Sequence, residues 1–554
     1  MKLTVFILAS ILVFSTCNAP ESVQLNSVEN EIIANKIDSF MSHCYEAGLF
    51  NGCALVAKGN DIVYREAFGY SDIFTGEPMN IESKFDIGSL TKSFTATAVM
   101  ILQEKGELSY EDKLSAFFPE FPDYAKQITL HHLLVHQSGI KDFHNDLALI
   151  SENLSDEIIL KRLVTEELWF DPGTRSMYSN SGYFLLARII EKISGMSFGN
   201  FLNQNIFRPL KMKNTLINDG ENVIISNKAI GKHFAESQDI HQYITGPSGI
   251  FITVDDLYKW HLHLCAPKIV SRESINKSFT ASKLVDGNET KYGYGWKVNP
   301  GQSDTIIEHG GGSFAGYMSY FIHPISCDHT IVLLYNYFLP ENFELVLKGI
   351  SKIIEGEIPM AKKTPAIHKL NKHIIDNGVV NLDEFYSKIN ADTLNYIPFR
   401  ELDFIRLSSF YKSRDQLNKS AALLAVYKDE FPNSVILFEE LIEIYTKTRS
   451  DELLKAAESE KQILEQKLSH IEPFEIQLLN PKTEDYEMNL RVRSGPGSDY
   501  DGISVIKPAE EYTVIGKSMN GEWLKLKREG WLYYRIGRVS KEQFNALPFV
   551  RHNK

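Results

Sequence analysis

Cysteine is scarce in this chain, with five residues among 554: Cys17, Cys44, Cys53, Cys265 and Cys327. Five cysteines form too few disulfides to stabilise a chain of this length, so the fold must depend on hydrophobic cores. Cys44 and Cys53 could pair in an oxidising compartment, or they could be two small buried side chains. The sequence leaves both readings open.

Positive charge is also in deficit, because 58 Lys and Arg residues face 71 Asp and Glu residues, for a net charge of −13. This balance argues against nucleic acid or an anionic membrane surface as a partner. A hydrophobic content of 43% with 23% charged residues is typical of a soluble globular protein. The length exceeds one ordinary core and indicates two or three domains.

Beyond the N-terminus no apolar run is long enough to span a membrane. Residues 1–19 have the pattern of an export signal, with Lys2 followed by a short apolar stretch and then small residues. Cys17 could become a lipidated first residue, or cleavage could follow Ala19, just before Pro20. We favour the lipid anchor, and expect a periplasmic or cell-envelope lipoprotein or a secreted protein.

Several catalytic signatures are missing, including Gly-x-Ser-x-Gly, His-Glu-x-x-His and a phosphate-binding glycine loop. Two histidine-rich groups occur instead, namely His131, His132 and His136, and His261, His263 and Cys265. Their spacings do not place all the ligands of either group on one helix face. We therefore interpret them as structural or surface residues and expect neither a metal nor an organic cofactor.

What the sequence does contain is a Ser-x-x-Lys motif, Ser89 to Lys92, at the start of an apolar run that should form a helix ending near Gly106. A serine hydroxyl needs a base within reach before it can attack a carbonyl. Helix residues i and i+3 share a face, so Lys92 can be that base. The helix N-terminus also favours developing negative charge.

Two further groups complete a plausible acyl-transfer site. Tyr178-Ser179-Asn180 is the one Tyr-x-Asn in the chain, and residues 309–312 read His-Gly-Gly-Gly. Tyr178 offers a second proton-transfer group, and the glycine run offers an exposed backbone N–H. Each piece alone has a plain structural explanation, but the three in this order indicate catalysis.

In this combination the chain resembles the serine beta-lactamase and penicillin-binding protein superfamily, in its class C beta-lactamase-like branch. The similarity extends over roughly residues 30 to 355 and includes the segments 133–140, 170–183, 207–215, 249–260 and 292–296. It implies an α+β hydrolase domain over residues 28–357, with an antiparallel sheet flanked by helices and a helical subdomain.

The hydrophobic pattern agrees with that fold. A hairpin is expected around the turn at Gly59-Asn60, helices from Ser89 to about Leu210, strands over 305–336 and a helix near 342–355. Strands at both ends of the domain with helices between them predict one antiparallel sheet built from both termini.

The resemblance also implies roles for the site residues. Ser89 would attack a carbonyl, Lys92 would be its immediate base, and Tyr178 would carry the proton to the leaving group. Asn180 would orient Lys92 and the substrate amide. The oxyanion would lie between the N–H groups of Ser89 and Gly312.

The resemblance assigns substrate and oxyanion binding to Asn180, His309, Gly311 and Gly312. His136 and Ser138 match a family segment and are interpreted as supports of the loop at the site.

His309 departs from the commonest family pattern, which has Lys at this position. An imidazole with an ordinary pKa of about 6.5 is mostly neutral at pH 7, so anionic beta-lactams should gain less there. We therefore expect an exported hydrolase of D-amino-acid peptides (DD-peptidase or D-aminopeptidase type) or of small esters and amides, with weak beta-lactamase activity at most. The alternative is an envelope binding protein that keeps the fold without useful turnover.

The C-terminal third lies outside the resemblance. Residues 356–370 have the composition of a linker. Residues 371–470 are wholly helical in pattern and resemble tetratricopeptide repeats around the turn at 432–434, although an ordinary helical spacer would give a similar pattern.

Residues 484–545 read as short strands and resemble a bacterial SH3-like β-barrel, with Arg-Ser-Gly-Pro-Gly at 493–497 and Gly-Trp-Leu at 530–532. Trp523, Trp531 and Tyr533 could line a ligand groove or fill the core of the barrel. By analogy, this part would bind peptidoglycan or an envelope protein.

Overall fold

The computed structural model describes much of the chain, and the described ranges are 21–73, 75–143, 155–220, 223–231, 244–301, 304–313, 315–336, 340–359, 364–392, 395–397, 399, 401–412, 415–430, 434–468, 474–477, 490–493, 502–506, 511–517, 523–526 and 530–533. The expected export signal at 1–19, with Cys17, lies outside these ranges, as does most of the Arg-Ser-Gly-Pro-Gly segment. None of the described helices combines the length and apolarity that a membrane crossing requires.

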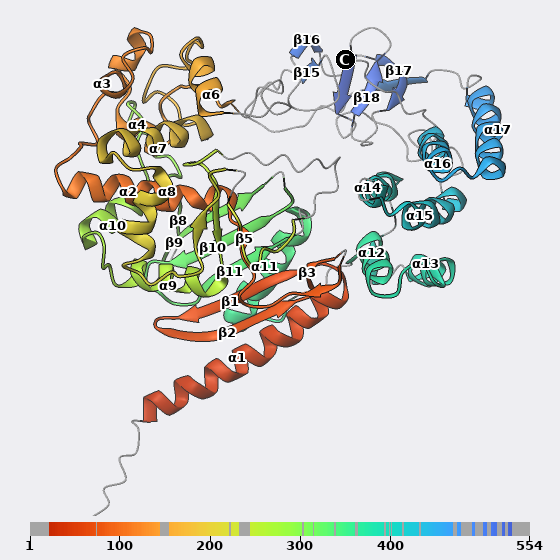
Figure 1. Ribbon diagram of the computed structural model, residues 1–554, viewed down its shortest axis with the longest axis horizontal. Coiled ribbons are helices and arrows are strands. Elements are labelled where there is room, and N and C mark those ends of the chain that lie inside the picture. The colour runs from red at the N-terminus through yellow and green to blue at the C-terminus, as the bar shows by residue number, and fades with distance from the viewer. Residues whose placement is uncertain are drawn as a thin grey trace, which may run out of the picture.

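A six-stranded antiparallel sheet forms the centre of the first domain, in the order β2-β1-β11-β10-β9-β8 (Figure 1). Its strands are β1 (Gly52–Lys58), β2 (Asp61–Phe68), β8 (Lys297–Pro300), β9 (Thr305–Gly312), β10 (Met318–Pro324) and β11 (Thr330–Tyr335). The two N-terminal strands pair with the C-terminal ones through β1 and β11, from Gly52 opposite Tyr335 to Ala57 opposite Thr330. The predicted α+β fold with a sheet built from both ends of the domain is confirmed.

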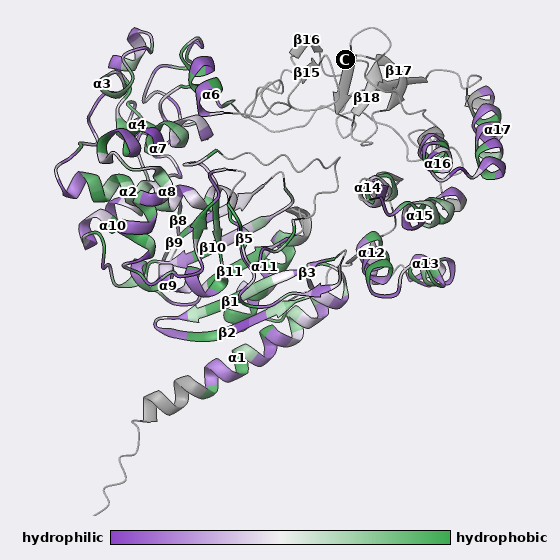
Figure 2. Ribbon diagram, viewed as in Figure 1, coloured by the Kyte–Doolittle hydropathy of each residue, from purple (hydrophilic) through white to green (hydrophobic). Residues whose placement is uncertain are grey.

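The sheet is covered on both faces, and the side chains of β1 show this by their alternation. Cys53 and Leu55 face one core, and Ala54 and Val56 face the other. In Figure 2 the central strands carry apolar residues, whereas the edge strand β2 is mixed. Helices α1 (Glu21–Glu46) and α11 (Pro340–Ile354) cover one face.

The other face of the sheet supports the larger core, which continues into a helical layer. The helices of this part are η1 (Gly88–Leu90), α2 (Thr91–Glu104), α3 (Leu114–Phe117), η2 (Asp123–Lys126), α4 (Leu130–Leu134), α6 (Asp156–Leu163), α7 (Asn180–Ser194), α8 (Phe198–Leu202), η4 (Asn203–Phe207), α9 (Val254–Cys265) and α10 (Arg272–Ser278). Short strands connect them, namely β3 (Tyr70–Asp72), β4 (Glu77–Pro78), β5 (Phe85–Asp86), β6 (Leu216–Ile217) and β7 (Ile250–Ile252).

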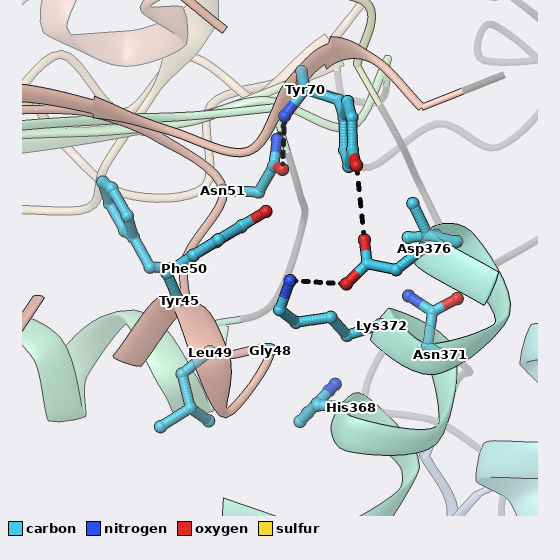
Figure 3. Close-up of a pocket in the computed structure, with 11 residues that line it drawn as sticks. Tyr45, Gly48, Leu49, Phe50, Asn51, Tyr70, His368, Asn371, Lys372 and Asp376 are labelled. Carbon is cyan, nitrogen blue, oxygen red and sulfur yellow. Dashed lines mark hydrogen bonds and ion pairs between the residues drawn. The ribbon is translucent and has the colours of Figure 1, made fainter. Parts of the chain in front are cut away.

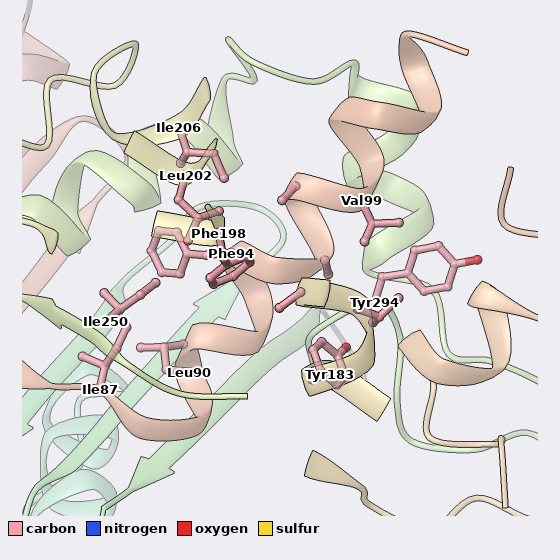
Figure 4. Close-up of a cluster of buried hydrophobic side chains, with 14 of the residues drawn as sticks. Ile87, Leu90, Phe94, Val99, Tyr183, Phe198, Leu202, Ile206, Ile250 and Tyr294 are labelled. Atoms are coloured by element: carbon pink, nitrogen blue, oxygen red, sulfur yellow. The ribbon is translucent and has the colours of Figure 1, made fainter. Parts of the chain in front are cut away.

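Helix α2 lies at the centre of this core (Figure 4), between side chains of α7, α8 and the strands. Residues 91–102 are all buried, so the helix has no solvent-facing side along this length. The helix ends at Glu104, and Gly106 takes a positive φ of 73° just beyond it. The predicted stop at Gly106 is thus confirmed.

The described helices after the first domain are α12 (Ala366–Asn377), α13 (Leu382–Ala391), α14 (Glu401–Lys412), α15 (Leu417–Glu430), α16 (Val435–Thr448) and α17 (Asp451–Leu468), with the short strands β12 (Thr364–Pro365) and β13 (Tyr396–Ile397). The prediction of a linker over 356–370 is wrong in its second half, because α12 begins at Ala366. Pro365 directly precedes that helix, and proline is well suited to a helix start as well as to a linker.

Helix α12 packs against the loop before β1, where a cavity of about 30 Å³ remains (Figure 3). Lys372 forms an ion pair with Asp376 across 2.7 Å, and its Nζ lies 3.8 Å from the centroid of the Tyr45 ring. A cavity of this size has room for about one water molecule. It lies between α12 and the first domain, and none of the residues around Ser89 lines it.

The last described elements are β14 (Phe474–Gln477), β15 (Leu490–Arg493), β16 (Gly502–Ile506), β17 (Glu511–Lys517), β18 (Trp523–Leu526) and β19 (Gly530–Tyr533), which pair in the order β14-β17-β18-β19-β15-β16. The tetratricopeptide-like and SH3-like assignments, and the domain limits drawn for them, remain predictions.

The cysteines do not follow the suggested pairing. Cys44 and Cys53 are both free and buried, so the reading of two small buried side chains is the correct one. A disulfide instead joins Cys265 and Cys327, which are 62 residues apart. These two residues come from α9 and from the turn between β10 and β11, and local spacing gave no sign of that proximity.

Candidate active site

Ser89 and Lys92 lie at the junction of η1 and α2. Lys92 Nζ is 3.0 Å from Ser89 Oγ. Ser89 is partly exposed, whereas Lys92 has no exposed surface. The spacing predicted from the motif therefore produces a direct contact between a reachable hydroxyl and a buried amine.

Lys92 Nζ has two further hydrogen-bond acceptors, Asn180 Oδ1 at 2.7 Å and the carbonyl oxygen of Pro247 at 3.1 Å. Burial lowers the pKa of the Lys92 amine to about 7, although the charge of Asp142 opposes that shift. A neutral amine keeps two N–H groups for Asn180 and Pro247, and its lone pair then faces Ser89. This is the arrangement that a general base for Ser89 requires.

Asn180 is the first residue of α7 and is held in place by Asp142. The backbone N–H of Asn180 donates to Asp142 Oδ2 across 2.9 Å, and its side-chain Nδ2 donates to the same oxygen across 3.0 Å. These two bonds fix the amide so that its oxygen faces Lys92. Asp142 was not predicted from the sequence; the available signal was an acidic residue two positions after the 133–140 segment.

Tyr178 completes the group around Ser89. Its ring centroid is 4.8 Å from Lys92 Nζ. Burial raises the pKa of the Tyr178 hydroxyl, and a hydrogen bond with Ser89 opposes that rise. The residue is 39% exposed in total, so part of the ring reaches the surface while the hydroxyl end is enclosed beside Ser89. Tyr178 can thus be approached by a substrate.

His136 supports this loop, as expected. Its Nδ1 accepts a hydrogen bond from the backbone N–H of Ser179 across 3.1 Å, and its ring lies 4.5 Å from that of Tyr178. His136 has a φ of +60°, which is uncommon for a residue other than glycine. The imidazole of His136 therefore holds the segment from Tyr178 to Asn180 in place.

His309 is 2% exposed, and both of its ring nitrogens have partners. Nδ1 lies 2.7 Å from the carbonyl oxygen of Gly310, and Nε2 lies 2.8 Å from the hydroxyl of Tyr292. A carbonyl can only accept, so Nδ1 carries the proton and Tyr292 donates to Nε2. Burial and the nearby Lys92 lower the pKa of His309 to about 3. This side chain is neutral at physiological pH, and Tyr292 was not predicted from the sequence.

The glycine run of β9 lies directly against the backbone that leads to Ser89. A Cβ placed on Gly311 would lie 1.8 Å from the carbonyl oxygen of Ile87, and one placed on Gly88 would lie 2.9 Å from Gly312 N. Gly88 also has a positive φ of 48°. Side chains are excluded here because the two backbones touch. Gly312 itself is exposed, and it lies beside Gly88, where the turn that contains Ser89 begins.

Residues 34–348, more than half of the chain, match the Beta-lactamase protein family. The chain belongs to this family. It is 33% identical over 361 residues to penicillin-binding protein 4* of Bacillus subtilis strain 168, covering 60% of this chain and 77% of that protein. It is 25% identical over 315 residues to protein flp of Staphylococcus aureus strain MW2, covering 54% of this chain and 62% of that one.

Solved structures share the fold. A penicillin-binding protein homologue from Pyrococcus abyssi, described as octameric, has a TM-score of 0.52 at 27% identity, over 61% of this chain and 81% of that one. A penicillin-binding protein from Bacillus halodurans shares the fold, with a TM-score of 0.50 at 24% identity, over 57% of this chain and 98% of that one. The protein is accordingly a serine hydrolase of the penicillin-binding protein and beta-lactamase type.

The predicted residues of this serine hydrolase fall into two groups. The first group lies around the Ser89 hydroxyl and consists of Ser89, Lys92, Tyr178 and Asn180, with Gly311 and Gly312 beside them. The second is His309, which is packed behind the site against Tyr292. Among the described residues, the one cluster of three or more potential metal ligands lies elsewhere, at His261, Cys265 and His323.

Proposed function

We propose that the enzyme acylates Ser89 and hydrolyses D-amino-acid peptides or small esters and amides. The observation that carries this proposal is the 3.0 Å contact between Lys92 Nζ and Ser89 Oγ, with the pKa of the amine lowered to about 7. An amine of this pKa is substantially neutral at physiological pH and can accept the serine proton.

In the proposed reaction, Ser89 Oγ attacks the substrate carbonyl as its proton passes to Lys92. The oxyanion forms between the backbone N–H groups of Ser89 and Gly312, and each such donor is worth roughly 2.7–4 kcal/mol of transition-state stabilisation. Tyr178 passes the proton to the leaving amine or alcohol. A water molecule then attacks the acyl-enzyme with the same groups acting in reverse.

The substrate preference follows from His309. Lysine at this position would supply a permanent positive charge, but His309 is neutral and its nitrogens are occupied by Gly310 and Tyr292. A substrate carboxylate therefore gains little here, which favours uncharged esters and amides over carboxylate-bearing beta-lactams. Weak beta-lactamase activity is compatible with this site.

Labelling with a fluorescent penicillin and with a fluorophosphonate tests the acyl-enzyme. The wild-type protein should be labelled and Ser89→Ala should not, with the far-ultraviolet circular dichroism of the two proteins unchanged. Absence of label on the folded wild type would favour the alternative, an envelope binding protein without turnover. A panel of nitrocefin, a D-Ala-D-Ala peptide and p-nitrophenyl esters then defines the substrate class.

We also propose an envelope location and a targeting role for the C-terminal segment. Binding of that segment to peptidoglycan would raise the local substrate concentration. Deleting residues 481–554 should weaken co-sedimentation with purified sacculi while sparing turnover of a small ester. Equal sedimentation of the two proteins would remove the targeting idea without affecting the acyl-enzyme proposal.

A further inference from the structure

A second cluster of reactive side chains, apart from the Ser89 site, contains two His-Cys pairs with the same spacing. His261 and Cys265 are four residues apart in α9, and His323 and Cys327 are four residues apart at the end of β10 and in the turn that follows. The fold brings the ligand atoms of His261, Cys265 and His323 within 4.8 Å of one another, and the disulfide joins Cys327 to Cys265 at this place. The local spacing of His261 and Cys265 gave no indication of a site, because the other pair comes from a different element.

Two of the separations between ligand atoms are those of tetrahedral coordination. His261 Nδ1 lies 3.2 Å from His323 Nδ1 and 3.6 Å from Cys265 Sγ. Bonds of about 2.05 Å to nitrogen and about 2.3 Å to sulfur place two nitrogens about 3.3 Å apart, and a nitrogen and a sulfur about 3.6 Å apart. These two separations match one zinc-sized ion, and the ligand atoms of all three residues lie within 4.8 Å of one another. Cys265 Sγ is also 3.8 Å from His261 Nε2, so the sulfur must turn towards Nδ1 once the disulfide is reduced.

The surroundings prepare the histidines as ligands. His261 Nε2 lies 2.6 Å from the carbonyl oxygen of Gly59, so it carries the proton and leaves a lone pair on Nδ1. A backbone carbonyl behind a metal-bound histidine is a common second contact. The hydroxyl of Thr330 lies 2.9 Å from His261 Nδ1 and 2.8 Å from His323 Nδ1, so an ion bound by both nitrogens must replace these two hydrogen bonds. Both imidazoles are fully buried.

We propose that the reduced chain binds one zinc-type divalent ion through His261, Cys265, His323 and Cys327, and that the Cys265–Cys327 disulfide is the oxidised form of the same site. A dithiol reductant gives two electrons and two protons to the disulfide, which becomes two thiols while the reductant becomes a disulfide. The ion then displaces the two thiol protons and is held by two thiolates and two neutral imidazoles.

Access and flexibility are compatible with this exchange. Both cysteines are partly exposed, so a reductant can reach them. The two sulfurs must separate to about 3.8 Å around a tetrahedral ion. Cys327 lies in an exposed turn with a positive φ of 65°, between Ser326 and Asp328 at the surface, where a small shift disturbs no core.

Cobalt is the probe for this site, because a tetrahedral Co²⁺ ion bound to thiolates has strong visible and sulfur-to-metal charge-transfer absorption. The full-length protein, reduced with a phosphine, should show this spectrum at one equivalent of Co²⁺, and one equivalent of Zn²⁺ should abolish it. The oxidised protein should show neither. An identical spectrum from the disulfide form would overturn the proposal, as would the absence of a tetrahedral spectrum from the reduced form.

Matched variants assign the ligands. Cys327→Ser, in the exposed turn, should lower the charge-transfer absorption by about half, and His261→Gln should weaken Co²⁺ binding at least about tenfold. His263→Gln on the same helix is the control, because His263 Nδ1 instead accepts from the backbone N–H of Lys268 across 3.0 Å. Cys53→Ser is the thiol control. If His261→Gln and Cys327→Ser bind as the controls do, the proposed ligand set is wrong.

A stability measurement covers the case in which a histidine variant does not fold. Zn²⁺ should raise the Tm of the reduced wild type and leave the Tm of the oxidised wild type unchanged, because only the reduced form offers two thiolates. Equal shifts in the two forms would contradict the proposal. Failure of either result leaves the Ser89 proposal unaffected, because His323 and the Gly312 pairing partner Met318 are five residues, about 17 Å, apart along β10.

Discussion

The hydroxyl of Tyr292 donates a hydrogen bond to Nε2 of His309 across 2.8 Å. Because Nδ1 of the same ring donates to Gly310, the imidazole has no free nitrogen. A buried tyrosine thus occupies Nε2, while burial and the nearby Lys92 lower the pKa of His309 and keep the ring neutral. The polarity of the substrate site depends on this pair as much as on the four residues around Ser89.

Replacing His309 by lysine should change substrate preference. A cation here would attract a substrate carboxylate, and hydrogen bonds to charged groups contribute about 1.5–3 kcal/mol. The kcat/KM for carboxylate-bearing substrates should therefore rise by about tenfold or more relative to neutral esters. His309→Gln is the neutral control and should leave the ratio near that of the wild type. If the ratio does not change in His309→Lys, our account of this position is wrong.

The pH dependence of acylation should report Lys92. Its pKa is lowered to about 7, and only the neutral amine can accept the Ser89 proton. The kcat/KM should therefore rise with pH through about 7 and fall towards acid as the amine is protonated. Lys92→Arg, which stays charged, should lose activity at every pH. A profile that is flat between pH 5.5 and 8.5 would argue against Lys92 as the base.

Asp142→Asn should move this profile. The carboxylate raises the pKa of Lys92 against the effect of burial, so removing its charge should shift the rising limb to lower pH. The asparagine side-chain oxygen can still accept from Asn180, so the fold should survive. Asp286→Asn, an exposed change on a turn, is the matched control. A rising limb at the same pH in both variants would contradict electrostatic coupling between Asp142 and Lys92.

Acid should destabilise the fold through His309. Its pKa is about 3 in the folded protein, against about 6.5 in an unfolded chain, so below pH 6.5 the unfolded state binds a proton that the folded state does not. The free energy of unfolding falls as the pH drops through this window, by about 2 kcal/mol at pH 5 from this residue. In His309→Gln the loss between pH 7.5 and pH 5 should be smaller by that amount. Urea unfolding at both pH values measures it, and an unchanged difference would refute the prediction.

Gly311→Ala should separate β9 from the turn before Ser89, because its Cβ would overlap the carbonyl oxygen of Ile87. Displacing an oxyanion donor typically costs about 10²–10³ in kcat. Gly220→Ala is the control, because a Cβ there meets open space and its φ is ordinary. The prediction fails if both variants retain wild-type kcat.

The sequence predicted the parts of the site that depend on local pattern. Ser89 and Lys92 were found because three residues of helix fix their relation, and the hairpin around Gly59 because strand periodicity and a turn coincide. Asp142 and Tyr292 were missed because their partners, Asn180 and His309, are brought to them by tertiary packing.

The disulfide between Cys265 and Cys327 was missed for the same reason. Cys265 and Cys327 come from elements that are joined in the fold by the packing of α9 on the sheet, and no period in the sequence marks that contact. The early start of α12 was missed for a different reason, because Pro365 fits a linker and a helix start equally well. Composition alone does not separate those two structures.

Strand β10 has one end opposite Gly312 and carries His323 near the other. If the exchange proposed at Cys265 and Cys327 takes place, the redox state at the far end should change the thermal stability of the molecule and leave the turnover at Ser89 constant. Resistance to unfolding and catalytic rate should then respond to mutations at opposite ends of one strand.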